Sequence, residues 1–160
     1  MDERIGLGGG CHWCTEAVFQ ALRSVSVVEQ GFVASVPPDE AWSEAVQVTF
    51  DPERLPLEVL LEVHLRTHAS TSAHKLRGKY RSAVYVFDEG QRVRAEAAVA
   101  SLQARFDAPL VTRVLPFAAF RASEARFQDY YASDPERPFC RTYIEPKLAW
   151  LRRTYGGEAR

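Results

Sequence analysis

Two cysteines follow a run of three glycines in the stretch Gly8-Gly9-Gly10-Cys11-His12-Trp13-Cys14. The glycines let the backbone turn sharply and keep side chains away from whatever approaches Cys11. If a helix begins at Cys11 or just before it, the unpaired N–H groups and the positive end of the dipole favour the thiolate. Cys11 is therefore predicted to be a nucleophile. Cys14 places a second thiol one helical turn away, and the pair can close a disulfide.

Three other interpretations compete for this stretch. Burial explains one cysteine, but not two that bracket Trp13 behind three glycines. A phosphate-binding loop is disfavoured because the glycine spacing fits neither the dinucleotide pattern nor a Lys-Ser/Thr ending. A zinc site needs a second close pair of ligands, and that spacing is missing from the remaining candidates, Cys140, His64, His68 and His74. A metal ion held by all three cysteines stays as an alternative.

A carboxyl group and a hydroxyl group are the other candidates for chemistry. Glu44 has the parity of Val46, Val48 and Phe50 on a predicted strand, so its carboxyl points to the side of the apolar row. Partial desolvation there raises a carboxyl pKa, which suits an acid that donates to a substrate oxygen. The alternative is that Glu44 lies at the strand end and its side chain turns into water. Tyr80 precedes the next strand, where its hydroxyl lies either at a site on the sheet edge or over the core.

The remaining polar residues receive less specific interpretations. Lys75, Arg77, Lys79 and Arg81 form a basic cluster, interpreted as a solvated loop. His64 lies among helix leucines and is expected at the surface or at its boundary.

Composition favours one soluble domain over residues 1–160. With 46% hydrophobic and 26% charged residues and a net charge of -1, nothing indicates a nucleic-acid partner. No apolar stretch has membrane length, and no signal peptide is expected at the N-terminus, so the expected location is cytoplasmic. Three cysteines in a reducing compartment point to catalysis or redox cycling.

Apolar periodicity predicts alternating strands and helices that would position these residues. The order is βαββαβ followed by αβ, which predicts an α+β two-layer sandwich: a ferredoxin-like mixed sheet with helices packed on it and a loop-rich C-terminal tail. From Pro116 onward the chain is expected to be mostly loop and short helix, with aromatic side chains that fold back onto the body. The expected strands span 4–8, 25–34, 44–50, 81–87 and 110–115, and the expected helices 14–22, 57–66 and 89–106. The last helix is expected to pack through Val93, Ala97, Val99 and Leu102.

A family resemblance joins these residues. Gly10-Cys11-His12-Trp13-Cys14-Thr15-Glu16 resembles the Gly-Cys-Phe-Trp-(Gly/Cys)-x-Glu signature of the A-class peptide methionine sulfoxide reductases. Segments 44–52, 80–83, 127–131, 139–140 and 146–148 resemble further family segments in the same order, so the resemblance covers nearly the whole chain.

The resemblance implies that Cys11 attacks a sulfoxide sulfur. Glu44 would be the acid, Tyr80 would hold the oxygen, and Trp13, with His12 beside it, would receive the substrate methyl group. The resulting sulfenic acid would be resolved by Cys14 or Cys140 and recycled by a thioredoxin-type reductant. The implied enzyme is a monomer that reduces methionine S-sulfoxide, free or in proteins, without metal or organic cofactor.

The sequence also departs from the family pattern. His12 stands where the family has Phe, Phe127 where it has His, and Lys75 where it has Asp. The loop between Phe32 and Glu44 is shortened. A trimmed rim is expected to open the site to a broader or different range of sulfoxides. The alternative function is a catalytically weakened redox-sensing or binding module on the same fold.

Overall fold

The structure, a computed structural model, describes residues 2–160, with Lys75 described by its backbone alone. Six strands form one sheet in the order β5-β4-β1-β3-β2-β6. The strands are β1 (Glu3–Gly8), β2 (Val25–Ala34), β3 (Ser43–Phe50), β4 (Ala83–Val86), β5 (Arg113–Pro116) and β6 (Ala119–Ala122). The α-helices are α1 (His12–Gln20), α2 (Leu57–Arg66), α3 (Glu89–Leu102), α4 (Tyr130–Ser133) and α5 (Glu145–Thr154). A π-helical turn, Cys140–Ile144, leads into α5.

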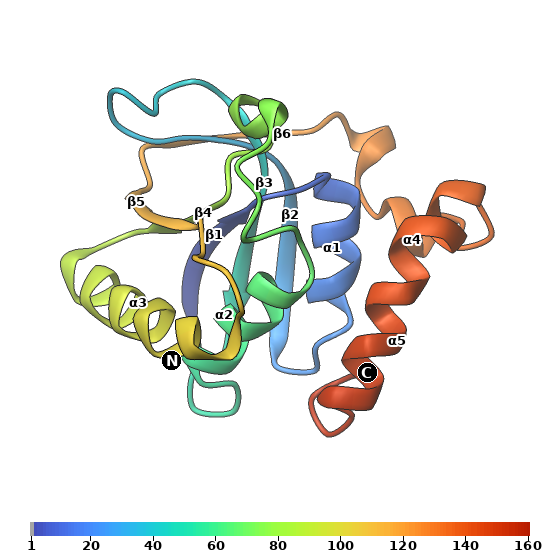
Figure 1. The fold of residues 1–160 in the computed structure, drawn as a ribbon. Coiled ribbons are helices and arrows are strands. Elements are labelled where there is room, and N and C mark those ends of the chain that lie inside the picture. The colour runs from blue at the N-terminus through green and yellow to red at the C-terminus, as the bar shows by residue number, and fades with distance from the viewer. Residues whose placement is uncertain (1) are drawn as a thin grey trace.

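The sheet is mixed, and its four central strands carry the predicted topology. Neighbouring strands are antiparallel except for β4 and β5, which are parallel. Strands β4, β1, β3 and β2, with α1 and α2 as connections, form the βαββαβ unit (Figure 1). The predicted α+β class with a ferredoxin-like mixed sheet is confirmed. Helix α2 and strand β2 begin and end at the predicted residues because their periodic apolar runs are bounded by clear turn signals.

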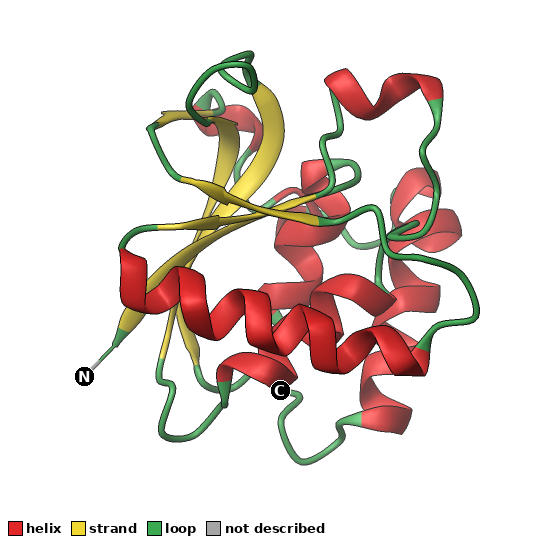
Figure 2. Cartoon of the chain, turned by 60° about the vertical axis from the view of Figure 1, so that its left-hand side comes forward, coloured by secondary structure: helices red, strands yellow, loops and turns green. Residues whose placement is uncertain are grey.

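Both faces of the sheet are covered. The larger core contains residues of β1 and β3 together with the apolar sides of α1, α2, α3 and α5, and Figure 2 shows α3 crossing in front of the strands. A smaller cluster of Val33, Ala45, Ala83 and Tyr85 occupies the opposite face. Clean alternation over residues 44–50 is typical of a strand with one face in water, yet β3 is covered on both sides.

Helix α3 packs through only part of the expected face, since Val99 and Leu102 contact the core as expected but Ala97 is exposed. Gln91, Ala95, Ala98 and Leu102 are buried, whereas Val93 is 54% exposed. The Asp88 side chain accepts a hydrogen bond from the Gln91 N–H at 2.7 Å, and the Gln91 amide donates to the Arg4 carbonyl at 2.8 Å. These bonds turn Gln91 toward the sheet and rotate Val93 outward.

The tail contains more regular structure than expected. Strand β6 pairs with β2 from Gly31 to Ala34 but spans only four residues, too few for periodicity to reveal it. Gly31 permits this pairing, since a β-carbon there would come within 2.2 Å of the Arg121 carbonyl oxygen. Farther along, the ten-residue helix α5 packs beside α1 (Figure 1).

Candidate active site

Cys11 lies between the glycine run and the first turn of α1, as the sequence predicts. Its carbonyl accepts the N–H groups of Cys14 and Thr15 at 3.1 and 3.2 Å, so the helix starts at this residue. The thiol is partly exposed, whereas the Cys14 and Cys140 thiols are buried. Among the three cysteines, Cys11 is thus the one that a substrate reaches first.

The glycine run is held by His64 of α2 and by residues from the polar segment that follows this helix. The Gly8 carbonyl accepts from Nε2 of His64 at 2.8 Å, and the Gly9 carbonyl accepts from Nη1 of Arg77 at 2.7 Å. A β-carbon on Gly9 would come within 2.4 Å of the His68 ring, so only glycine fits there. The turn before Cys11 is therefore held in one conformation by side chains of other segments.

Hydrogen bonds favour the thiolate form of Cys11. The Cys14 thiol donates to the Cys11 sulfur, and this bond is the largest cause of a lowered Cys11 pKa. Backbone N–H groups of Trp13 and Cys14 lower the pKa further, whereas burial and the nearby Glu44 carboxyl oppose them. The backbone N–H groups of the first helical turn and the Cys14 thiol together favour the thiolate at Cys11.

Glu44 lies beside Cys11 and is only 6% exposed. Oε1 accepts the backbone N–H of His12 at 3.2 Å and faces Nε2 of the same residue at 3.5 Å. Oε2 faces Nζ of Lys79 at 3.5 Å. The carboxyl therefore points inward, as its strand parity predicts, and does not turn into water.

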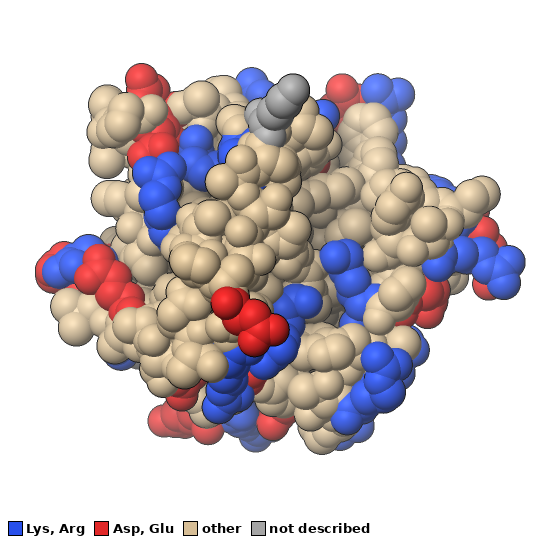
Figure 3. All heavy atoms as spheres, viewed as in Figure 1, with Lys and Arg blue, Asp and Glu red and all other residues tan. Residues whose placement is uncertain are grey.

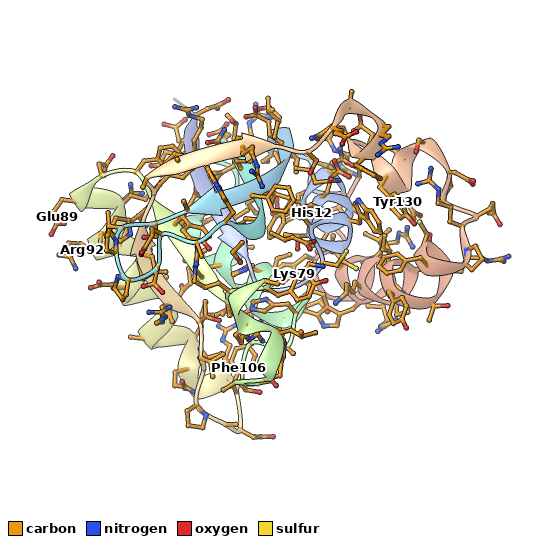
Figure 4. All side chains as sticks on the ribbon, turned by 90° about the horizontal axis from the view of Figure 1, so that it is seen from above. His12, Lys79, Glu89, Arg92, Phe106 and Tyr130 are labelled. Carbon is orange, nitrogen blue, oxygen red and sulfur yellow. The ribbon has the colours of Figure 1, made fainter. Side chains whose placement is uncertain are left out.

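Lys79 links Glu44 to Tyr80. A hydrogen bond to Tyr80 and the charge of Glu44 raise the pKa of the Lys79 ammonium group. Its Nζ also lies 5.1 Å from the centre of the Tyr80 ring. Figure 4 looks down on the N-terminal end of α1, where the labelled His12 and Lys79 lie close together. The half-buried Tyr80 thus lies at the rim of the site, where the sequence analysis placed it as one alternative.

Trp13 is held in an aromatic cluster built by the C-terminal tail. Its indole stacks on Tyr130 with ring centres 4.1 Å apart, and Phe139 meets it edge-on at 5.6 Å. Phe127 lies 6.1 Å away. The prediction that tail aromatics fold back onto the body is confirmed for these residues, which fix the orientation of Trp13.

A cavity of about 410 Å³ opens beside the two residues that follow Cys11 in the sequence. Its lining includes His12, Trp13, Phe32, Arg121 and Phe127. Apolar ring surfaces face a single guanidinium, that of Arg121, which lies 5.1 Å from the Phe32 ring centre. The cavity therefore offers an apolar wall with one cationic group at its edge.

The two other cysteines lie on the inner side of the site. Cys14 has a raised pKa, first because of its hydrogen bond to Cys11 and then because of burial, with a smaller contribution from Cys140. Cys140 is 0% exposed, and its thiol lies 3.7 Å from the Asp134 carbonyl. Cys14 contacts Cys11, whereas Cys140 affects Cys14 and is not among the groups that shift the pKa of Cys11.

Glu16 connects α1 to the tail, a role that sequence reasoning missed. Its buried carboxyl accepts the N–H groups of Asp129 and Tyr130 at 2.9 and 3.1 Å and the Gln30 amide at 3.0 Å. Asp129 has a positive φ of 54°, an uncommon conformation for a non-glycine residue. The signal was present, since Glu16 closes the motif that begins at Gly10, but its partner lies 113 residues away.

We expect Glu16→Ala to destabilise the protein by about 2 to 4 kcal/mol, because it leaves buried backbone donors and Gln30 without an acceptor. The loosened Tyr130 would also weaken the stack on Trp13 and raise KM. Urea unfolding and steady-state kinetics measure the two effects. Glu53→Ala, in an exposed turn, serves as the control, and equal stabilities of the two variants would contradict the assignment.

The expectation for His64 is wrong: the residue is 2% exposed. Burial lowers its pKa to about 4, from an ordinary value of 6.5, with Arg77 adding to the shift. The unfolded chain then binds a proton between pH 6.5 and 4 that the folded protein does not, so stability is lost as the pH falls through this window. The bond to Gly8 requires the neutral ring to carry its hydrogen on Nε2.

We expect acidification from pH 6.5 to 4 to cost wild type about 3 kcal/mol more unfolding free energy than it costs His64→Gln. Urea titrations at several pH values measure this difference. His74→Gln, in an exposed histidine, should retain the wild-type dependence. An identical pH dependence in His64→Gln would contradict this account of His64.

The basic cluster is not a solvated loop. Arg81 is buried, with its guanidinium donating to the Tyr85 hydroxyl and to the carbonyls of Val33 and Ala41. Arg77 donates to the carbonyls of Gly9 and Tyr80. These side chains shape the loop around the site because their acceptors lie on distant segments. The side chain of Lys75 lies outside the described residues.

Two further searches cover residues 2–160. No group of three His, Cys, Asp or Glu residues in this range is arranged to hold a metal ion. Within the same range, no helix combines the length and the apolar character needed to cross a bilayer.

Comparisons with known proteins agree with the geometry. The family model described as peptide methionine sulfoxide reductase matches residues 3–159. The peptide methionine sulfoxide reductase MsrA of Thermus thermophilus is 37% identical over 170 residues, which cover 97% of this chain and 97% of the relative.

Solved structures support the same fold. Reduced Mxr1 from Saccharomyces cerevisiae matches with a TM-score of 0.77 at 20% identity, covering 89% of this chain and 91% of that one. The same yeast protein in complex with Trx2 matches with a TM-score of 0.64 at 21% identity, covering 81% and 84%.

Proposed function

The chain belongs to the peptide methionine sulfoxide reductase family, and we propose that Cys11, Glu44 and Tyr80 carry out its thiol-dependent reduction of methionine sulfoxide. The observation that carries these roles is the arrangement at the start of α1. A thiol with a lowered pKa lies there beside a buried carboxyl that accepts the very next N–H group. Nucleophile and acid thus approach one sulfoxide group from the same end of the helix, the thiolate at its sulfur and the carboxyl at its oxygen.

In the first step, the Cys11 thiolate attacks the sulfoxide sulfur. The oxygen takes a proton from Glu44, methionine leaves as the thioether, and Cys11 becomes a sulfenic acid. The Tyr80 hydroxyl, at the rim, donates a hydrogen bond to the oxygen as its negative charge develops. His12 and Trp13 border the space for the substrate methyl group, and their rings support the assignment of that space.

Cys14 is the first resolving residue in this proposal. Its thiol already donates to the Cys11 sulfur, so the condensation that forms a disulfide and releases water needs little movement. Cys140 lies behind Cys14 and is fully buried. It takes over by thiol–disulfide exchange once the turn Cys140–Ile144 opens. The disulfide is then reduced by a thioredoxin-type protein, the kind of partner suggested by the yeast relative's complex with Trx2.

The substrate range follows from the cavity beside Cys11. We propose that the S epimer of methionine sulfoxide is reduced both free and in proteins, because the apolar rings leave the site open on the side of Arg121 and Phe127. Positive and negative side chains are intermixed over the face drawn in Figure 3, so no single-signed surface selects a charged macromolecule there.

The proposed setting is a reducing one. Three cysteines without disulfides support a cytoplasmic location. We also propose a single domain over residues 1–160 that acts as a monomer, since the exposed large hydrophobic residues are scattered over separate segments.

A single-turnover assay tests this function. Reduced protein is mixed with an excess of each epimer of methionine sulfoxide without reductant, and methionine and free thiols are counted. We expect one methionine per chain from the S epimer with the loss of two thiols, a second methionine where exchange with Cys140 frees Cys11 again, and no product from the R epimer. Addition of thioredoxin, its reductase and NADPH should give continuous turnover. Oxidation of Cys11 by peroxide without any methionine formation would instead support the redox-sensing module.

A further inference from the structure

The imidazole of His12 donates a hydrogen bond from one of its two nitrogens. Nδ1 lies 2.9 Å from the Gly31 carbonyl oxygen of β2. A carbonyl oxygen only accepts hydrogen bonds, so Nδ1 must carry a hydrogen. In the neutral ring, the other nitrogen, Nε2, then bears only a lone pair.

That second nitrogen faces Glu44. Nε2 lies 3.5 Å from Oε1, the same oxygen that accepts the backbone N–H of His12. A neutral Nε2 facing a carboxylate would set two lone pairs against each other in a buried site. One proton between them removes this conflict, carried either by the ring as imidazolium or by Glu44 as the carboxylic acid.

The surroundings keep this proton within the pair. The His12 ring is 7% exposed and meets the Phe32 ring edge-on at 5.3 Å, with Trp13 on its other side. Lys79 is the charged group on the far oxygen of Glu44. Three further titratable or charged groups surround the ring. Cys11 precedes His12 in the sequence, and the Arg121 guanidinium lies over the Phe32 ring. Glu16 lies one helical turn after His12, where it is hydrogen-bonded to Gln30 and to the tail.

We propose that His12 is a positioning residue that shares one proton with Glu44 and so keeps the acid loaded at alkaline pH. The proposal rests on the function proposed above. As the Cys11 thiolate bonds to the sulfoxide sulfur, the S–O bond breaks and the shared proton goes to the oxygen. The oxygen ends as the hydroxyl of the Cys11 sulfenic acid, the sulfoxide is reduced by two electrons, and solvent returns one proton to the pair.

This role predicts a particular pH dependence. In a variant without the imidazole, only Glu44 is left to hold this proton, between the His12 N–H on one oxygen and Lys79 on the other. Wild type should therefore stay active to higher pH than a variant that lacks the imidazole. A purely structural role for His12 would instead lower the rate by the same factor at every pH.

First-turnover rates of methionine formation from pH 5 to 9 test this for wild type, His12→Phe and His12→Gln. We expect the alkaline limb of His12→Phe to move down by about one pH unit, so its deficit relative to wild type grows about tenfold between pH 6 and pH 9. His12→Gln should follow His12→Phe, because its amide reaches Glu44 but carries no titratable proton. A constant rate ratio across this range, or a wild-type limb in His12→Gln, would overturn the proposal.

Two measurements separate this result from other causes. Alkylation of Cys11 by iodoacetamide over the same pH range reports folding of the site and titration of the thiol itself, so a shift confined to sulfoxide reduction belongs to the His12–Glu44 pair. His74→Phe makes the same exchange in an exposed loop and should keep the wild-type profile. If wild type itself reduces no sulfoxide, the proposed function fails, whereas parallel profiles in active proteins overturn only the role of His12.

Discussion

Replacing Cys11 with serine should lower sulfoxide reduction by at least about a thousandfold, the largest effect expected of any single substitution in this chain. A serine hydroxyl at the same position keeps the start of α1 and the hydrogen bond with Cys14, but it is not ionised at neutral pH. Neither methionine nor a disulfide should form when reduced Cys11→Ser is mixed with an excess of the S-sulfoxide.

The matched control is Cys14→Ser, which makes the same sulfur-to-oxygen replacement at the cysteine three residues after Cys11. It should still release about one methionine per chain in the first turnover, because the nucleophile is intact and the new hydroxyl still donates to the Cys11 sulfur. Turnover with thioredoxin should then become slow, since Cys140 must reach a sulfenic acid that it does not contact in the reduced protein. Activity in Cys11→Ser equal to that of Cys14→Ser would refute the assignment of the nucleophile.

A third variant isolates the effect of the Cys14 hydrogen bond. In Cys14→Ala the donor to Cys11 is lost, and with it the largest cause of the lowered Cys11 pKa. Alkylation of Cys11 at pH 7 should therefore be slower in Cys14→Ala than in Cys14→Ser, and the two rates should converge at alkaline pH.

Local patterns predicted the parts of this site that lie on regular elements. Glu44 shares a strand with Val46, Val48 and Phe50, and alternation along eight residues was enough to place its carboxyl on the helix-bearing side. Cys11 was placed by the glycine run and the helical pattern after it. In both cases the information lies within a few residues of the group concerned.

The parts that were mispredicted depend on distant acceptors. Arg81 and His64 read locally as solvent-facing, yet they are buried because carbonyls on other strands need donors. In the sequence Glu16 resembles any polar residue of a helix, and only the folded structure shows that two backbone N–H groups of the tail donate to it. The spacing of residues in the sequence does not indicate these pairings. Charged and polar residues are mostly exposed in proteins, so residue type alone predicts that these side chains lie at the surface.

Lys79 and His12 illustrate the same limit inside the site. The sequence assigns Lys79 to a basic loop, and it identifies His12 as a departure from the family pattern beside the expected methyl pocket. Their contacts with opposite oxygens of Glu44 come only from the fold. Polar groups from α1, β3 and the loop before β4 converge on one carboxyl, and this convergence distinguishes the site from a cysteine that is merely exposed.

The second large effect is expected at Glu44. Glu44→Gln should lower sulfoxide reduction by about a hundredfold or more, because the amide keeps the shape of the side chain and accepts the His12 N–H but has no acid proton to give. The same change removes a carboxyl that raises the pKa of Cys11 whenever it is ionised. Alkylation of Cys11 by iodoacetamide at pH 7 should therefore be as fast as in wild type or faster.

These opposite signs make the experiment decisive for the role of Glu44. If Glu44→Gln damaged the structure of the site, both sulfoxide reduction and alkylation of Cys11 would be lost. If it removed only the acid, alkylation would continue and sulfoxide reduction would stop. Glu29→Gln is the matched control. The Glu29 carboxyl on β2 accepts a hydrogen bond from the Gln47 amide on β3 and contacts none of the site residues. Sulfoxide reduction in Glu44→Gln within a few-fold of Glu29→Gln would show that the proton comes from another group, and a parallel loss of alkylation would reduce Glu44 to a support for the helix start.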